Sequence, residues 1–196
     1  MIYLARHGQT AYNLEGRFQG WGDVPLDQTG RQQAQQLAIA VAEVEPVALV
    51  SSDIARAVET ATIVAEHVDL ELQIDPRFAE TETGDWTDRS FAEVAAEDPE
   101  AFTSFVELKA DWGFPGGESF ATQAARVAAG LDDWRSRGET GAVVIVCHGN
   151  VIRLALRDAG RDGSERPDNG SLVALCRGWR KSSLRCSWLP QAGRSL

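Results

Sequence analysis

Cysteine and histidine are scarce in this sequence, which has three of each, and the three cysteines are widely spaced. They provide neither a disulfide framework nor a zinc ligand pair, so Cys147, Cys176 and Cys186 are expected to be reduced thiols. No apolar run approaches the roughly 20 residues that cross a bilayer. The first residues also lack the basic and long apolar segments of a secretory signal, so we expect a cytoplasmic protein.

Positive charge is scarce as well, since 19 Lys and Arg face 29 Asp and Glu, which gives a formal net charge of -10. Nucleic acids and anionic membranes are bound through Lys and Arg contacts to phosphate, so neither is an expected partner. Acidic side chains dominate from Glu80 to Glu118, and the charged side chains from Arg177 onward are all basic. Solvated faces of opposite sign explain this asymmetry, and a homodimer contact is the alternative.

The order of apolar segments is typical of an α/β protein. Apolar residues 2–5, 47–50 and 143–147 are predicted as buried strands, and amphipathic helical patterns lie between them. We therefore predict a three-layer sandwich in one domain, residues 1–196, with a mostly parallel central sheet and helices on both faces. Residues 78–137 are expected to form a mostly helical insertion over the active site.

Weaker patterns complete this scheme. Residues 70–74, 172–175 and 183–189 are predicted as further strands. Thr29, Ser52 or Asp53, and Ser90 are expected to be N-caps, because short oxygen-bearing side chains precede apolar residues at helical spacing. Glu93 follows Ser90 at the spacing of a capping box.

Two of the three histidines occupy equivalent places in the pattern. His7 and His148 each follow a predicted strand and precede a glycine. Ligands of open α/β sheets bind at the carboxyl ends of the strands, so both imidazoles are expected to face one cleft. His67 lies near the end of a predicted helix, where a surface role is expected.

Arginines accompany the two histidines. Arg6 adjoins His7, Arg17 lies in the first loop, Arg56 lies in the first turn of a helix, and Arg153 follows the second histidine by about one turn. A cation in the first turn of a helix opposes the helix dipole, and an anionic ligand would resolve that conflict. Guanidinium groups and helix N-termini both suit phosphate oxygens, so the pattern predicts an anion site.

A metal site is the main rival for a set of histidines and carboxylates. Several guanidinium groups would repel a divalent cation, and no H-x-H, H-x-x-x-H or H-x-E/D spacing occurs. We therefore expect no metal and no cofactor.

Cleavage of a phosphate monoester also needs an acid that protonates the leaving oxygen, which contributes roughly 10²–10⁴-fold. The candidates are Glu80, Glu82 and Asp85, in the segment ETETGD over residues 80–85. An acid-rich polar loop without a catalytic role is the alternative interpretation, and residue type alone does not choose among them.

Five groups of residues resemble motifs of the histidine phosphatase superfamily, also called the phosphoglycerate mutase-like family. They are residues 4–10 (LARHGQT), 16–21 with 23–26 and 29–30, 51–57 with 60–61, 84–86 with 115–119, and 146–149 with 151–153 and 169–172. The motifs follow one another in the family's order and extend over nearly the whole chain. A single RHG triplet would be weak evidence, whereas five motifs in order make the resemblance specific.

The resemblance implies a phosphomonoesterase that acts on a small phosphorylated metabolite. His7 would attack phosphorus and form a phosphohistidine, while Arg6, Arg56 and His148 would bind the equatorial oxygens. Counted back from residues 84–86, the acid position of the family falls on Glu80. Substrate contacts are expected from Asn13, Arg17, Gln19, Gly20, Trp21 and Gly149.

Two other functions remain open at this point. A 2,3-bisphosphoglycerate-dependent phosphoglycerate mutase would need a second basic cluster in the middle region, which is acidic here, although Asn150 is a mutase-like residue. A non-catalytic protein that binds phosphoryl ligands would not need the set of His7, Glu80 and His148. Thr87 and Asp88 replace a Glu-Gly pair common in the family, so the motifs leave the physiological substrate unassigned.

Overall fold

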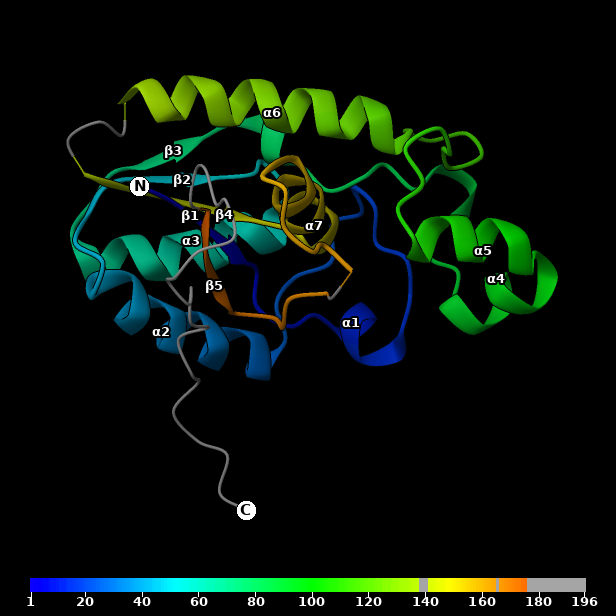
Figure 1. Ribbon diagram of the computed structural model, residues 1–196. Helices are drawn as coiled ribbons and strands as arrows, with labels where there is room; N and C mark the ends of the chain where they lie inside the picture. The colour runs from blue at the N-terminus through cyan, green and yellow to red at the C-terminus, as the bar shows by residue number, and fades with distance from the viewer. Residues whose placement is uncertain (138–140, 165, 176–196) are drawn as a thin grey trace, which may run out of the picture.

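The computed structural model describes residues 1–137, 141–164 and 166–175, and a single five-stranded sheet organises them (Figure 1). The strands are β1 (Ile2–Arg6), β2 (Pro46–Ser51), β3 (Leu72–Ile74), β4 (Ala142–Cys147) and β5 (Leu172–Leu175), in the order β3-β2-β4-β1-β5. Only the edge strand β5 is antiparallel to its neighbour. The predicted strand at 183–189, Cys176 and Cys186 lie outside the described residues.

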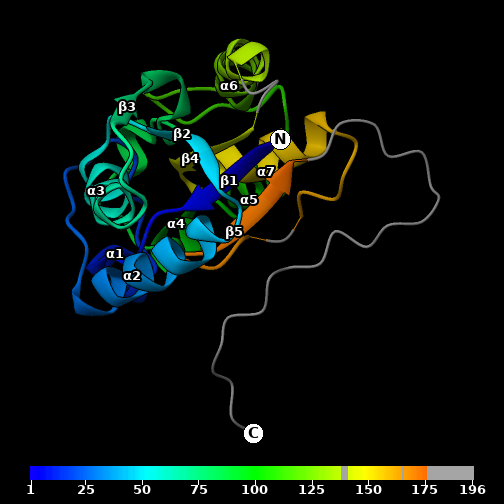
Figure 2. The ribbon, with the colours of Figure 1, turned by 90° about the vertical axis from the view of Figure 1, so that its left-hand side faces the viewer.

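Two pairs of helices cover the two faces of the sheet (Figure 2). Helices α2 (Gln28–Ala42) and α3 (Ala55–Val68) pack on one face, and α6 (Phe120–Arg137) and α7 (Gly149–Asp158) pack on the other. Strand side chains alternate between the two cores, since Val144 and Val146 contact the first pair and Val143 and Ile145 the second. The predicted three-layer α/β sandwich is therefore confirmed.

The stretch 78–137 divides into two parts with different surroundings. Helices α4 (Phe91–Glu97) and α5 (Pro99–Val106) stand beyond the end of the sheet, where they enclose a separate aromatic cluster (Figure 1). Helix α6 packs instead along the sheet, because Val127, Leu131 and Trp134 bury one apolar stripe against the main core. Helix α6 thus packs as part of the sandwich, and Gln123 near its start donates to Glu80.

The pairing of β1 with β4 positions the two histidines. Arg6 pairs with Cys147 at the end of both strands, and the backbone N–H of His7 donates to Cys147 O at 3.0 Å. His148 is the residue that directly follows β4. The two histidines therefore leave the same edge of the sheet side by side. Helix α1 (Ala11–Glu15) follows close behind His7.

The observed N-cap residue matches the predicted one for one helix and differs from it for two. Ser90 caps α4 and forms the predicted capping box with Glu93. Helix α2 begins earlier than expected, because Asp27 rather than Thr29 is its N-cap and accepts from Gly30 N at 2.7 Å. No side chain caps α3, whose N-cap is Ile54. Among the described helices, none is long and apolar enough to cross a membrane.

The cap of α2 gives a stability prediction. We expect Asp27→Ala to lower the free energy of unfolding by about 1–2 kcal/mol, because it removes the N-cap acceptor. Thr29→Ala, two residues away on the exposed side, should change it by less than about 0.5 kcal/mol. Urea unfolding followed by tryptophan fluorescence measures both, and a larger loss for Thr29→Ala would contradict the assigned cap.

Candidate active site

A cavity at the ends of β1 and β4 gathers most of the residues that the sequence singled out. Those that line it are Arg6, His7, Asn13, Arg17, Gln19, Gly20, Arg56, Glu80 and Gly149. His148 lies directly beside them, with its ring centroid 5.2 Å from that of His7. Trp21 lies apart, half-exposed, and borders a neighbouring hollow with Asp23 and Asp53.

The His7 imidazole is buried and held in one orientation. Its Nδ1 lies 2.7 Å from Gly8 O, and because a carbonyl only accepts, Nδ1 carries the proton. Its Nε2 therefore keeps a lone pair, toward which Arg56 Nε points at 3.3 Å. Burial, reinforced by the charges of Arg56 and Arg6, holds the pKa of His7 well below its usual 6.5. The imidazole is therefore a neutral potential nucleophile.

Two buried guanidinium groups flank this ring. Arg56, from the first turn of α3, donates to Gly22 O at 3.1 Å and to Gly20 O at 2.9 Å. Arg6, at the end of β1, donates to Pro167 O at 2.7 Å. Burial is the largest cause that lowers the pKa of each to about 10, so both remain charged at neutral pH.

His148 is held by a hydroxyl. Its Nε2 lies 2.9 Å from Ser52 Oγ, which already accepts from Ile54 N at 3.1 Å. The Ser52 hydroxyl can donate its hydrogen to Nε2 in the tautomer of His148 that carries its proton on Nδ1, and it can accept from Nε2 in the other tautomer. Burial is also the largest cause that keeps the pKa of His148 well below 6.5, so this ring is neutral too.

Two buried side-chain nitrogens near the cavity lack a hydrogen-bond partner among the described residues. Arg6 Nε and His148 Nδ1 are buried and make no hydrogen bond to the described residues. A buried donor without a partner costs about 1–3 kcal/mol, so native proteins rarely retain one that serves no ligand. A tetrahedral oxyanion beside His7 would satisfy Arg6 Nε, and it would also satisfy His148 Nδ1 in the tautomer that carries its proton there.

Among the described residues, a single carboxylate lines the cavity. Glu80 Oε1 accepts from Thr81 N at 2.9 Å and Gln123 Nε2 at 3.3 Å, and Oε2 lies 3.4 Å from Asn150 N at the start of α7. Of the carboxylates that the sequence offered, Glu82 and Asp85 are not among the residues that line the cavity. Glu80 is therefore the one placed to exchange a proton with a bound ligand.

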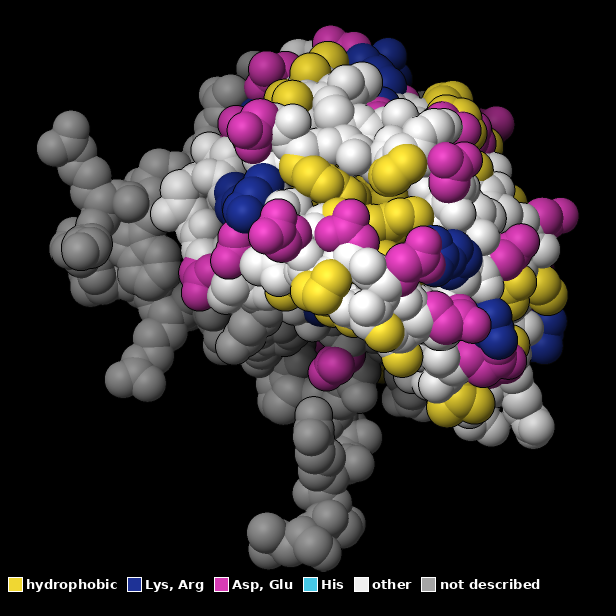
Figure 3. Space-filling view, turned by 90° about the vertical axis from the view of Figure 1, so that its right-hand side faces the viewer, with side chains coloured by type: hydrophobic (Ala, Val, Ile, Leu, Met, Phe, Trp, Pro, Cys, Tyr) yellow, Lys and Arg dark blue, Asp and Glu magenta, His cyan; other side chains and the backbone are white. Residues whose placement is uncertain are grey.

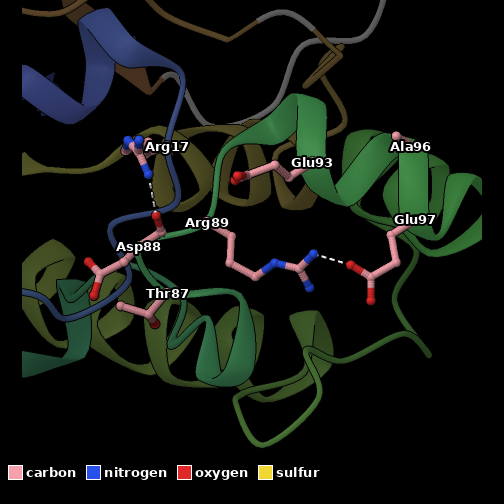
Figure 4. A pocket seen from close by; sticks show the side chains of 7 residues that line it. All are labelled: Arg17, Thr87, Asp88, Arg89, Glu93, Ala96 and Glu97. Atoms are coloured by element: carbon pink, nitrogen blue, oxygen red, sulfur yellow. Dashed lines mark hydrogen bonds and ion pairs between the residues drawn. The ribbon is translucent and has the colours of Figure 1, made fainter.

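The other expected contacts are more peripheral. Arg17 stands between the cavity and an open surface hollow, pairs with Glu15 at 2.7 Å and donates to Asp88 O at 2.8 Å (Figure 4). Asn13 accepts from Asn169 Nδ2 at 3.1 Å. Trp21 touches the site indirectly, because its Nε1 donates to the Glu80 backbone oxygen at 2.7 Å and helps to fix that residue.

Sequence reasoning missed several residues of the cavity. Phe18, Thr83, Phe91, Phe105, Asn150 and Arg166 also line it. The loop after α7 is a second omission, since Asn169 Nδ2 donates to His7 O at 3.0 Å and Gly170 N donates to Arg6 O at 3.0 Å. Only the asparagine-glycine pair before β5 gave a signal, and no pattern pointed to Arg166.

The assembled groups are suited to an anion. Two neutral imidazoles, two guanidinium groups and unused N–H donors surround one carboxylate, a set that stabilises negative charge on phosphoryl oxygens. Within the described residues, no group of three or more His, Cys, Asp or Glu side chains is arranged to bind a metal ion.

Comparison with known proteins agrees with this geometry. The family model of the histidine phosphatase superfamily (branch 1) matches residues 2–178. Glucosyl-3-phosphoglycerate phosphatase of Mycobacterium tuberculosis is 36% identical over 159 residues, 77% of this chain and 71% of that protein. A probable phosphoglycerate mutase of Proteus mirabilis is 33% identical over 155 residues, 79% of this chain and 72% of that protein.

Solved structures give the same result. A mycobacterial glucosyl-3-phosphoglycerate phosphatase in complex with VO3 aligns with a TM-score of 0.79 and 33% identity, over 88% of this chain and 90% of that chain. A phosphoglycerate mutase from Thermus thermophilus aligns with a TM-score of 0.72 and 31% identity, over 88% of this chain and 90% of that chain. The cavity built on His7 and the match over residues 2–178 agree: this chain belongs to the histidine phosphatase superfamily, branch 1.

Proposed function

We propose that this protein hydrolyses the phosphate monoester of a small metabolite through a phosphohistidine on His7. The observation that carries the proposal is the neutral His7 imidazole, whose unprotonated Nε2 accepts from Arg56 Nε, beside buried side-chain nitrogens that have no partner among the described residues. Relatives named as phosphatases of glucosyl-3-phosphoglycerate support hydrolysis of a small phosphorylated metabolite.

In the first step, His7 Nε2 forms a bond to phosphorus as the bond from phosphorus to the ester oxygen breaks. Glu80, as the carboxylic acid, gives its proton to the departing oxygen, which leaves as an alcohol. The Nδ1–H bond to Gly8 O stabilises the imidazolium that results. Arg6, Arg56 and the Nδ1–H of His148 stabilise the charge on the three equatorial oxygens.

In the second step, Glu80 as a carboxylate takes a proton from water, and the oxygen of that water attacks phosphorus. The bond from phosphorus to Nε2 breaks, which releases inorganic phosphate and restores neutral His7. One carboxyl group thus alternates between acid and base. Its two oxygens are held by groups from three segments, so it stays at the cavity through both steps.

A metal-free, cofactor-free activity in the cytoplasm is part of the same proposal. The cavity supplies its positive charge through guanidinium groups, which stabilise transferring phosphoryl oxygens as a metal ion would. Cys147, the cysteine within the described residues, is a free buried thiol, in line with a reducing compartment.

Mutase activity is the second candidate, because some relatives carry that name. A mutase retains a doubly anionic intermediate while that intermediate reorients, which requires basic groups on the covering segment. Residues 80–118 contain only Arg89 and Lys109 as cations, and each forms an ion pair with an acidic neighbour. Acidic side chains spread over the face near α4 and α5 (Figure 3), so hydrolysis is favoured.

The nucleophile gives the first prediction of this proposal. His7→Ala should lower turnover of p-nitrophenyl phosphate by about 10⁴-fold or more, because no other described side chain that lines the cavity is placed to attack phosphorus. Assays contain EDTA throughout, so that contaminating metal supplies no rate. Wild-type enzyme quenched during turnover should carry an acid-labile phosphoryl group on His7. Inactivation of the wild type by EDTA, reversed by a divalent ion, would contradict the mechanism.

The acid gives the second prediction. Glu80→Gln should slow hydrolysis of an alkyl phosphate by roughly 10²–10⁴-fold and affect p-nitrophenyl phosphate much less in the first step, because p-nitrophenolate leaves without a proton. Burst kinetics separate this step from hydrolysis of the phosphohistidine. Glu82→Gln is the matched control, and if that variant shows the leaving-group dependence instead, Glu80 is not the acid.

The neutral histidines give a prediction for stability. Folded His7 and His148 have pKa values well below 6.5, whereas the unfolded chain binds protons at both near pH 6.5. Their contribution to stability is therefore complete above pH 6.5 and is lost as the pH falls below it. Each histidine adds up to about 1.4 kcal/mol per pH unit to this slope. Urea unfolding between pH 7.5 and pH 5 should show a smaller slope for His7→Gln, and an unchanged slope would refute the assignment.

A further inference from the structure

Arg166 places a guanidinium group at the mouth of the catalytic cavity, where no described residue accepts a hydrogen bond from it. It lies in the loop after α7 and lines the same cavity as His7 and Glu80, while remaining accessible to solvent. It makes no hydrogen bond and no ion pair with any residue in the described part of the chain. A guanidinium carries five N–H donors in a planar fork, and here all of them are available to a ligand.

Packing holds this side chain in place. The guanidinium lies over the rings of Phe91 and Phe105, 5.3 Å and 5.7 Å from their centroids. A methyl group on Gly149 would lie 3.7 Å from both Arg166 Cγ and Arg6 Nε, so the side chain crosses the start of α7 beside the phosphoryl site. Its loop is anchored in turn by the bond from Arg6 to Pro167 O.

The surroundings of Arg166 are mostly positive. Burial near the cavity is the largest cause that lowers its pKa, and its charge in turn lowers the pKa values of Arg6 and Arg153. Glu80 is the acidic group that opposes these effects. A second anion at the mouth would relieve this repulsion, in addition to the phosphoryl group deeper in the cavity.

The neighbouring arginines are satisfied by the protein. Arg17 pairs with Glu15 and donates to Asp88 O (Figure 4). Arg153 donates to Gly163 O at 2.9 Å and to Val106 O. Arg17 and Arg153 thus form hydrogen bonds between segments of the chain. Among the described residues, Arg166 instead contacts aromatic rings, and its N–H groups donate to none of them.

We propose that Arg166 is a specificity residue, which binds a second anionic group, a carboxylate or a phosphate, on the leaving group of the substrate. The inference rests on the proposed function, in which Glu80 marks the leaving-group side of the cavity. The substrates it favours are phosphate monoesters of hydroxy acids or bisphosphates, with the second anion within reach of one arginine side chain. Planar guanidinium forks bind such groups through paired hydrogen bonds.

Two pairs of substrates test the proposal. 3-Phosphoglycerate and glycerol 3-phosphate differ by a carboxylate in place of a hydroxymethyl group, and fructose 1,6-bisphosphate differs from fructose 6-phosphate by a second phosphate. The wild type should prefer the more anionic member of at least one pair by about 10–100-fold in kcat/KM, the range of a charge-assisted hydrogen bond. The pair that shows the preference identifies the anion.

Arg166→Gln should abolish this preference, chiefly by raising KM for the more anionic substrate, and leave glycerol 3-phosphate hydrolysis within about threefold. Arg166→Lys should restore part of it, since it keeps the charge without the planar fork. Arg135→Gln, in the last turn of α6, is the matched loss of one positive charge and should keep the preference. Calorimetric binding of each substrate to His7→Ala, with and without Arg166→Gln, gives the same comparison without turnover.

The outcomes separate the two claims. A wild type that hydrolyses both members of each pair equally overturns the second anion site and leaves the phosphatase intact. Equal slowing of all substrates by Arg166→Gln also overturns it, because the guanidinium would then act through Glu80. If no monoester is hydrolysed, the proposed function fails, while preferential binding of the more anionic member to His7→Ala, lost with Arg166→Gln, would still support the site.

Discussion

The parallel pairing of β1 with β4 is the constraint on which the rest of the site depends. Because Arg6 and Cys147 are partners at the ends of the two strands, the residues that follow are neighbours, although they lie far apart in the sequence. A shift of register by one residue would turn His7 or His148 toward the opposite face of the sheet. Alternate side chains of both strands pack into two separate cores, and this packing holds the register and with it the distance between the imidazoles.

The same positions carry a cost in stability that the ligand would remove. Arg6, Arg56 and two neutral histidines are buried together, and two side-chain nitrogens lack partners within the described residues. Such an arrangement persists only where many surrounding contacts hold it in place. Backbone carbonyls supply these contacts: those of residues 20, 22 and 167 accept from Arg56 or Arg6, and that of residue 8 accepts from His7. The two arginines are therefore oriented by backbone oxygens rather than by acidic side chains. The cavity therefore keeps its positive potential for a ligand.

Much of this could be predicted from sequence, and the limits have physical causes. Strand periodicity and the two histidine-glycine pairs predicted the sandwich and the shared cleft, because both depend on short-range patterns. Phe91 and Phe105 were not singled out from the sequence, because only the folding of α4 and α5 against the end of the sheet brings them to the cavity. Arg166 gave no signal, because a lone arginine in a polar loop is typical of a surface charge. The N-cap of α2 was predicted two residues too late, at Thr29 instead of Asp27. Asp27 also accepts a hydrogen bond from Gln9, and this tertiary contact, which the local sequence does not reveal, holds Asp27 at the start of the helix.

Five consecutive residues of the loop between α7 and β5 both line the cavity and hold the residues at the end of β1. Arg166 reaches over the cavity mouth, while Pro167, Asn169 and Gly170 hold Arg6 and His7 by hydrogen bonds. An insertion or deletion here would disturb the positions of Arg6, His7 and Arg166 together. The segment of α4 and α5 reaches the cavity in a different way, because Phe91 and Phe105 line it through side-chain packing beneath Arg166.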